Sequence, residues 1–334
     1  MKITLSPMPA LALALAGLAS LAGAPAAIAQ QPVVLKAVTA WDKSLAFVDK
    51  YMEWISRVNQ RSAGKVRIDY IGGPEVFPSL EQLEPLKRGT FATVVTSTGY
   101  MAGALPELNA TWFGFGATPA ELRAAGLADA IDRVTREKAG VAVLGFPLQM
   151  RFNVYLKKPI QKADLSGMKL RTSPVYDPVL KALNAVTVSV PPAELLTALE
   201  TGIVDGFAWP AVAVTGPGYA RAIRYKVTPP WWVGTDIALI NAKVFDALPA
   251  GVRKLLIDTM MEIEREVPGY YLAKEKLEDA AMAKMGIKNI ATSDADMRKI
   301  HQAQWDAGTQ AFLLGPSPKY GPQLVEIVKR FASK

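Results

Sequence analysis

The 334-residue chain contains no cysteine and a single histidine, His301. Without cysteine there are no disulfides and no thiol chemistry, and a transition-metal site would have to be built almost entirely from carboxylates. His301 stands within a predicted helix, far in sequence from any acid or base partner, so its expected role is structural. The motifs G-x-x-x-x-G-K-S/T, G-x-G-x-x-G, H-E-x-x-H and G-x-S-x-G are also missing. These absences argue against most enzyme classes, and no cofactor or metal is expected.

Long blocks of like charge are missing as well. The chain has 38 Lys and Arg against 30 Asp and Glu, a net charge of +8, and the basic excess is spread along its length. Proteins that bind nucleic acid gather basic residues into a stretch or onto one face, so nucleic acid is not a predicted partner. A dispersed positive field instead favours the attraction of an anionic small molecule.

The chain opens with a targeting pattern. Lys2 supplies a positive start, the apolar run ALALAGLASLAGA follows, and Ala27-Ile28-Ala29 has the small-x-small form of a cleavage site. The run is shorter and richer in Ala and Gly than a membrane span, which needs about 20 apolar residues. Residues 1–29 are therefore predicted to be a cleaved signal peptide. Because no cysteine is available for a lipid anchor, the mature protein is expected to be soluble in the periplasm.

After the signal peptide, strand patterns alternate with helix patterns, which is typical of an α/β fold. The predicted strands include 33–41, 66–71, 91–98, 141–146 and 237–245. The predicted helices include 44–61, 79–88, 119–139, 250–286, 293–314 and 320–332. About 300 residues are too many for one core, so two domains are expected. Pro268 removes a backbone donor within the helix 250–286 and is expected to kink it.

Two arginines stand out between residues 151 and 210. Arg151 opens the alternating segment RFNVYL, so we expect it at the edge of a strand, and Arg171 ends the short strand GMKLR. Ligands of α/β sheets lie beyond the carboxyl ends of the strands, and a guanidinium can grip both oxygens of a carboxylate. The pair therefore predicts an anion clamp, although a lone arginine is more often a solvated charge or an ion-pair partner.

This region resembles the solute-binding proteins of tripartite ATP-independent periplasmic (TRAP) transporters. The resemblance is carried by Arg151, by DLSGMKLR at 164–171 and by PPAELLTALETGIVDG at 191–206. Upstream it continues through LKAVTAW at 35–41, RSAGKVRIDYIGG at 61–73 and EQLEPLKRGTFATVV at 81–95. It implies a receptor that binds an organic carboxylate between two lobes and delivers it to a small and a large membrane subunit. A monomer or weak dimer is expected.

The resemblance also implies that the strand 237–245 returns to the first sheet. Lobe I is then assigned residues 30–148 and 237–276, and lobe II residues 149–236 and 277–334. Two connections between the lobes make a hinge, which suits closure around a ligand. The helix 250–286 is expected to pack along both lobes.

Several further residues are predicted to line the cleft. By the same strand-end rule, the first lobe offers Trp41, Ser97, Thr98 and Tyr100. Three residues differ from the family's pattern. After V-D-G, where the family usually has an amide, this chain has Phe207-Ala208-Trp209. Leu196 replaces the Tyr of the S-E-x-Y helix, and Ser97 replaces an acidic residue found in some members. Indole in place of an amide adds an apolar face, so a carboxylate with an apolar or aromatic body is expected rather than a sugar acid. Alternatively, Trp209 packs in the core of its lobe.

Two other functions stay open at the level of sequence. A receptor for an ATP-driven (ABC-type) importer shares the two-lobed design and differs in its membrane partner. A hydrolase or lyase that uses only carboxylates is a further alternative, which turnover of a candidate ligand would distinguish from a binding protein.

Overall fold

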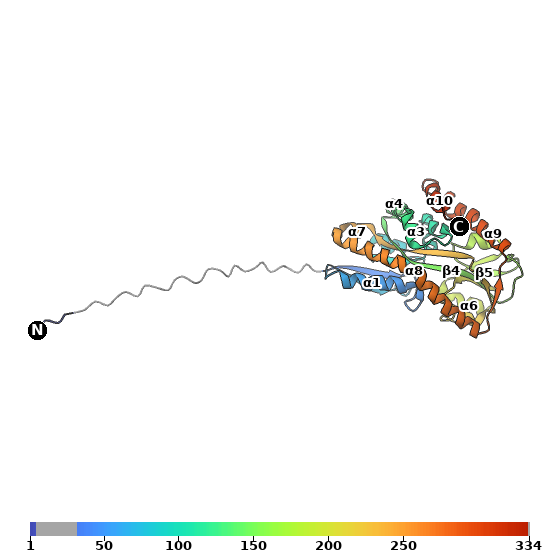
Figure 1. Ribbon diagram of the computed structural model, residues 1–334, viewed down its shortest axis with the longest axis horizontal. Coiled ribbons are helices and arrows are strands. Elements are labelled where there is room, and N and C mark those ends of the chain that lie inside the picture. The colour runs from blue at the N-terminus through green and yellow to red at the C-terminus, as the bar shows by residue number, and fades with distance from the viewer. Residues whose placement is uncertain (5–31, 333–334) are drawn as a thin grey trace. The chain divides into compact units, whose positions relative to one another are not determined.

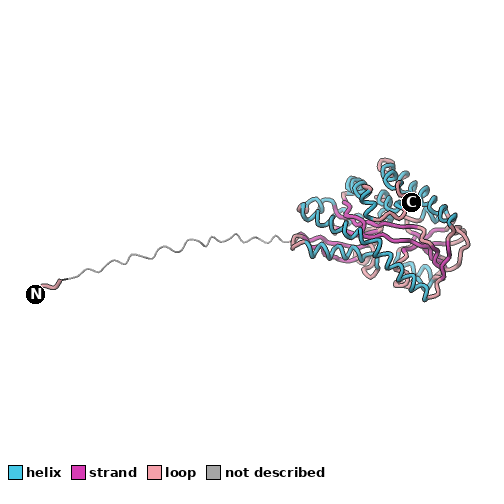
Figure 2. The backbone as a smooth tube through the Cα atoms, viewed as in Figure 1, coloured by secondary structure: helices cyan, strands magenta, loops and turns pink. Residues whose placement is uncertain are grey.

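A computed structural model describes residues 1–4 and 32–332 of the chain (Figure 1). The predicted signal peptide therefore lies almost wholly outside the described residues. In the described part, no helix combines the length and the apolar character that a bilayer span requires. Strands run through the middle of the body from Pro32 onward, and helices cover both sides of them (Figure 2).

In this body the described strands form one mixed sheet in the order β2-β1-β3-β9-β4-β7-β5-β6, with β8 beside β4 and β10 beside β8. Their bounds are β1 (Val33–Thr39), β2 (Val66–Gly72), β3 (Thr93–Thr96), β4 (Val141–Leu156), β5 (Lys169–Thr172), β6 (Val186–Ser189), β7 (Gly206–Pro210), β8 (Tyr225–Thr228), β9 (Trp232–Asn241) and β10 (Lys288–Ala291). We call β1, β2 and β3 with their helices the first lobe, and β5 to β8 with β10 the second lobe. The strands β4 and β9 are shared between the two.

Helices connect the strands. Their bounds are α1 (Asp49–Arg61), α2 (Leu83–Arg88), α3 (Pro119–Ala124), α4 (Leu127–Ala139), α5 (Asp177–Ala182), α6 (Leu195–Glu200), α7 (Ala242–Ala247), α8 (Ala250–Lys284), α9 (Asp294–Ala303) and α10 (Gly321–Lys329). Short 3₁₀ helices include η2 (Thr98–Met101) and η3 (Pro106–Gly114). In α1 the buried residues Tyr51, Trp54, Ile55 and Val58 form the predicted helical stripe. This arrangement confirms the predicted α/β fold.

Strand β4 differs from the sequence prediction, which ended one strand at 146 and began another at Arg151. The two are one strand, because Leu148, Gln149 and Met150 pair with β9, so Arg151 lies within a strand and not at its edge. The register shifts on either side of Gly145, whose φ of +151° an L side chain rarely adopts. A Cβ there would stand 2.3 Å from the Glu264 carboxylate, so only glycine lets α8 approach this bulge.

Helix α8 joins the two lobes. From the first lobe, Trp54 donates its indole N–H to the backbone carbonyl of Leu256 at 3.0 Å. In the second lobe, Glu278 accepts from the backbone of Val214 at 2.6 Å, and Lys226 pairs with Asp279 at 2.5 Å. The helix runs as one element through Pro268. Contacts with both lobes agree with the predicted packing of this segment.

The C-terminal helix corrects one sequence assignment. Residues 277–334 were given to lobe II, but Leu324 and Val328 of α10 lie in a core with Val38 and Val94 of the first lobe. Helix α10 also contacts η3 and α4. The physical reason is the apolar stripe of α10, which is buried against the first lobe and forms part of its core.

Candidate binding site between the lobes

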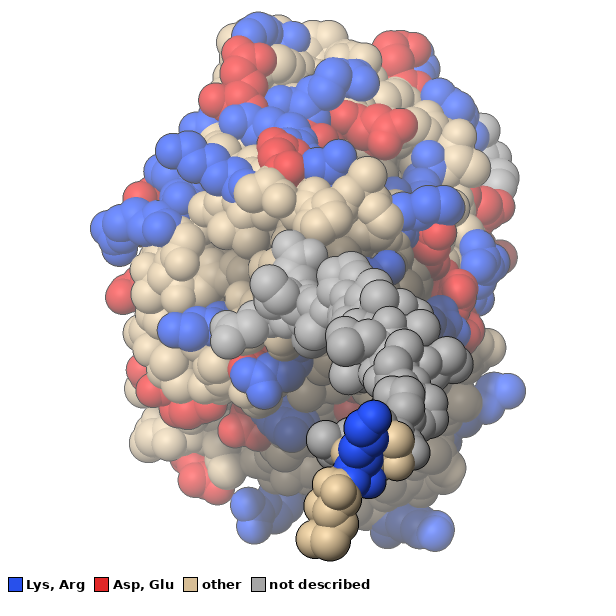
Figure 3. Space-filling view, turned by 90° about the vertical axis from the view of Figure 1, so that its left-hand side faces the viewer, with Lys and Arg blue, Asp and Glu red and all other residues tan. Residues whose placement is uncertain are grey.

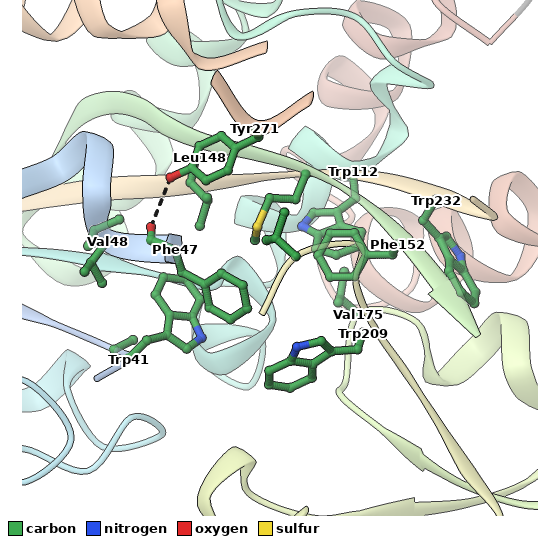
Figure 4. Close-up of a cluster of buried hydrophobic side chains, with 14 of the residues drawn as sticks. Trp41, Phe47, Val48, Trp112, Leu148, Phe152, Val175, Trp209, Trp232 and Tyr271 are labelled. Atoms are coloured by element: carbon green, nitrogen blue, oxygen red, sulfur yellow. Dashed lines mark hydrogen bonds between the residues drawn. The ribbon is translucent and has the colours of Figure 1, made fainter. Parts of the chain in front are cut away.

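A small cavity lies where β1, β3 and β9 meet β5 and β7; we call it the Arg171 cavity. Much of its wall is aromatic, from Trp41, Phe47, Tyr100, Trp112, Tyr176 and Trp209. Figure 4 shows several of these side chains gathered between the lobes. The free space is about 20 Å³, room for roughly one water molecule. An organic acid would therefore need the walls to move apart before it could enter.

Arg171 is the cationic group of this cavity, and its side chain is almost fully buried, at 2% exposure. Its Nε donates to the Val190 carbonyl at 3.0 Å and its Nη1 to the Tyr176 hydroxyl at 2.7 Å. No ion pair of Arg171 occurs among the described residues. A buried guanidinium held only by neutral acceptors is an unusual and costly arrangement.

Trp209 both lines the cavity and packs in the core of its lobe, the two roles that the sequence left open. It borders the Arg171 cavity and lies 5.1 Å beneath the Arg171 guanidinium, measured to the ring centroid. Its N–H donates to the Ala213 carbonyl at 3.1 Å, so it is not free for a ligand. The indole therefore offers its face to the cavity while packing against Phe47 and Tyr219.

From the first lobe, Trp41, Ser97 and Tyr100 border the cavity, as their positions at strand ends predict. Burial raises the pKa of Tyr100 to about 12, so its hydroxyl stays neutral at physiological pH. Gly99, beside Tyr100, brings the two lobes into contact, because a Cβ there would stand 3.2 Å from the Cβ of Val175. The lobes are thus closed against each other at this point.

Besides Arg151, which is described below, two of the predicted site residues do not border the cavity. Thr98 is fully buried, and its hydroxyl donates to Asn109 at 3.1 Å. Phe207 is also fully buried and stacks on Tyr155 with ring centroids 5.1 Å apart. Both residues pack behind the side chains that line the cavity.

Arg151 lies in different surroundings. Successive side chains of a strand point to opposite faces, so Met150 and Phe152 reach the Arg171 cavity while Arg151 faces α8. There its Nε donates to Glu275 at 2.7 Å, and its side chain is 45% exposed. It borders a larger cavity of about 270 Å³ together with Gln149 and Tyr271. The structure does not bring the two arginines into one clamp.

Asp236 is a cavity residue that the sequence argument missed. It is 2% exposed and accepts a hydrogen bond from the backbone N–H of Thr98 at 3.2 Å. Burial raises the pKa of this carboxyl to about 7, although the Thr98 N–H lowers it in part. Asp236 lies within β9, in the run WWVGTDIALIN. The sequence feature that could have indicated this site residue is a single acidic side chain within a mostly apolar strand.

No group of three or more His, Asp or Glu side chains suited to a metal ion occurs within residues 1–4 and 32–332. Basic and acidic side chains lie intermixed on the face shown in Figure 3. The polar groups that line the Arg171 cavity are the Arg171 guanidinium, the Asp236 carboxyl and the side chains of Ser97, Ser173, Tyr100 and Tyr176.

Comparison with known proteins shows the family of the chain. Residues 39–311 match the model of the bacterial extracellular solute-binding proteins, family 7. The chain belongs to this family. Members are receptors and not enzymes, and the resemblance to TRAP solute-binding proteins is confirmed.

Solved structures share the receptor's fold. A TRAP periplasmic solute-binding protein from Desulfovibrio salexigens, with bound orotic acid, has a TM-score of 0.81 at 20% identity, over 90% of this chain and 98% of that one. One from Rhodoferax ferrireducens, with bound malonate, has a TM-score of 0.76 at 20% identity, over 90% and 98%. These likenesses confirm the two-lobed fold.

Among curated proteins, a monocarboxylate 2-oxoacid-binding periplasmic protein from Nostoc sp. is 25% identical over 289 residues, which are 80% of this chain and 76% of that protein. The receptor is therefore similar along most of its length to a protein that binds small organic acids.

Proposed function

We propose that the receptor captures an organic carboxylate in the Arg171 cavity. The observation that carries this proposal is the buried Arg171 guanidinium, which has no carboxylate partner among the described residues. A ligand carboxylate would supply the missing counter-charge and use the remaining N–H donors in a bidentate grip. The malonate, orotic acid and 2-oxoacids of the related proteins belong to the same chemical class.

The body of the ligand is proposed to be apolar or aromatic. Trp209 presents a ring face because its N–H is bonded to Ala213, and Phe47, Phe152 and Val175 add further apolar wall. Such walls leave few partners for the many hydroxyls of a sugar acid, which would lose hydrogen bonds to water on entry. An acid with one carboxylate end and a compact hydrocarbon part fits these surroundings better.

Binding is proposed to involve opening and closing of the lobes. A cavity of about 20 Å³ cannot admit an organic acid without movement. The chain passes between the lobes in β4, β9 and α8, and the bulge at Gly145 interrupts the β4–β9 register. These connections are suited to a hinge. Lobe I as 30–148 with 237–276 remains our proposed division, and α10 joins its core.

Arg151 is proposed to contribute less to binding than Arg171. Its guanidinium already has a carboxylate partner in Glu275 and is half exposed. A second contact with the ligand would require that pair to open. Its effect on affinity is therefore expected to come mainly through the position of β4 against α8.

After export directed by residues 1–29, the receptor is proposed to work in the periplasm as a monomer or weak dimer. It would hand its ligand to the small and large membrane subunits of a TRAP transporter. Two neighbouring membrane-protein genes, one small and one large, would support this partner. A neighbouring ATPase gene would favour the ABC-type alternative instead.

Calorimetry on the purified receptor tests the carboxylate proposal. The ligands are short aliphatic acids, diacids, 2-oxoacids, aromatic acids and sugar acids, each beside its uncharged amide. We expect at least one acid to bind while its amide does not, because the amide cannot pair with Arg171. Equal binding of an acid and its amide, or turnover of the bound acid, would contradict the proposal.

A further inference from the structure

The cavity holds a second polar centre besides Arg171. Asp236 borders it from β9, while Arg171 reaches it from β5; the sheet order places β4 and β7 between these strands. Neighbouring strands lie about 4.8 Å apart, so the two charged groups enter from well-separated backbone positions. Among the described residues Asp236 has no ion pair with Arg171 or any other cation. Its carboxylate accepts from the Thr98 backbone at 3.2 Å, and the Ser97 side chain and the Trp112 indole also lie beside it. An ionised carboxylate offers about four acceptor sites, so a further donor can still bind there.

Trp112 provides a hydrogen-bond donor at the same centre. Its side chain is 2% exposed, and its indole N–H has no acceptor in the described structure. The ring is fixed by contact with the strand, since a Cβ on Gly234 would stand 2.4 Å from a ring carbon. In Figure 4 the indole nitrogen faces the interior of the aromatic cluster, on the side of Phe47. A buried N–H that lacks a partner is rare and needs an explanation.

The two groups lie close to each other. The Ser97 side chain and the indole N–H of Trp112 both lower the pKa of the Asp236 carboxyl, which places both groups beside it. The Trp112 N–H does not reach a full hydrogen bond with any acceptor of the described residues. One donor and one acceptor therefore stand side by side in the cavity wall. Burial of the Trp112 N–H without an acceptor is unfavourable, and a small group that accepts from this N–H and donates to Asp236 would bind to both.

We propose that Asp236 and Trp112 bind one hydroxyl group of the ligand, so that the receptor selects a hydroxy acid with an apolar body. The hydroxyl would donate to the Asp236 carboxylate and accept from the Trp112 N–H. An ammonium group leaves the indole N–H unpaired, an oxo group leaves the carboxylate unpaired, and a plain hydrocarbon leaves both unpaired. This inference rests on the proposed binding of the carboxylate by Arg171.

Calorimetry at pH 8 with matched acids tests the selection of the hydroxyl. The probes are 3-phenyllactate, 3-phenylpropanoate, phenylpyruvate and phenylalanine, and the shorter pair lactate and propanoate. We expect the hydroxy acid of each series to bind at least about tenfold more tightly than its analogue without the hydroxyl, because a site built for a hydroxyl rejects ligands that leave it unpaired. Equal affinities within each pair, or a preference for the amino or oxo acid, would overturn the inference. If no acid of any series binds, the proposed function itself has failed.

Two variants assign the selection to these residues. Trp112→Phe removes only the N–H and is expected to reduce the hydroxyl preference to about threefold or less, whereas Trp232→Phe should leave it unchanged. Trp232 is the matched control, because its N–H is also buried and unpaired but does not border the cavity. In Asp236→Asn the amide oxygen can still accept from Thr98, which turns the NH₂ toward the ligand. The preference should then shift from phenyllactate to phenylpyruvate, an inversion that a general loss of structure would not produce. Unchanged selectivity in both variants would refute the assignment.

Discussion

Arg171 and Arg151 are both strand residues at the boundary of the lobes, and their surroundings are opposite. Arg171 is 2% exposed and bonded to a carbonyl and a phenol. The Arg151 side chain is 45% exposed and paired with the Glu275 carboxylate. The cavity beside Arg151 is also the larger, about 270 Å³ against 20 Å³. The unpaired charge therefore lies in the tighter space.

The larger cavity is not the one that holds the unpaired charge, so the proposed binding site rests on charge and not on cavity volume. An arginine that already has its carboxylate gains little from a second one, whereas a buried arginine without one gains a full counter-charge. An anion would be stabilised more strongly in the smaller cavity, because Arg171 has no counter-charge there. The small volume is explained by the closed position of the lobes.

Replacement of Arg171 should have the largest effect. Arg171→Ala is expected to weaken carboxylate binding by about 2–5 kcal/mol, because the ligand's charge is left buried and unpaired. The affinity of Arg171→Lys should fall between those of wild type and Arg171→Ala, since lysine keeps the charge but not the bidentate fork. Calorimetry measures both, with the solvent-exposed Arg67→Ala as control. Unchanged affinity in Arg171→Ala would remove this residue from the site.

The carboxyl in the Arg171 cavity should make stability depend on pH. The pKa of Asp236 is raised from 3.8 to about 7 in the folded state. The folded protein therefore holds this proton more tightly, and the stabilisation is present below pH 3.8 and lost as pH rises to about 7. Chemical denaturation of wild type and Asp236→Asn should show wild type losing up to about 4 kcal/mol relative to the variant across this range.

Glu266 provides the opposite control for this titration. Hydrogen bonds from Arg57 hold its pKa below the usual 4.5, so its contribution is present above that pH and lost as pH falls. Relative to Glu266→Gln, wild type should therefore gain stability as pH rises through the acidic range. If the stability of wild type relative to Asp236→Asn also increased as pH rises, Asp236 would not be the group that makes stability fall with pH.

Closure of the lobes over the Arg171 cavity should be sensitive to Gly99. Gly99→Val adds a side chain against Val175 and should weaken ligand binding by about 1–3 kcal/mol through overpacking. Gly103→Val is the matched control, because a Cβ there has no neighbour within 4 Å. Small-angle scattering should show a smaller radius of gyration on ligand binding in wild type and in the control, and less change in Gly99→Val. Identical scattering of wild type with and without ligand would count against a hinge.

Arg151 should show the smallest effect. Arg151→Ala removes the half-exposed partner of the buried Glu275, which keeps Lys226 at 4.0 Å as a second cation. The variant should lose some stability but should reduce ligand affinity less than tenfold. Calorimetry of Arg151→Ala beside Arg171→Ala measures the difference. A loss in Arg151→Ala as large as in Arg171→Ala would mean that both arginines bind the ligand.

The sequence by itself determined the class of protein and much of the architecture. Periodicity located β1, β2, β3 and the stripe of α1, since a core can be built only from apolar residues that recur on one face. It also singled out Arg171, because a guanidinium at a strand end before a loop stands where α/β sheets bind ligands. Trp41, Ser97 and Tyr100 followed from the same rule.

Tertiary structure decided which arginine keeps a free charge. The partner of Arg151, Glu275, lies 124 residues later on α8, and no local pattern predicts that pairing. The same limit hid the joining of β4 into one strand, the packing of α10 on the first lobe, and the meeting of Asp236 with Trp112. Each depends on contacts between segments far apart in the chain, which the packing of the whole body selects and local residue patterns do not encode.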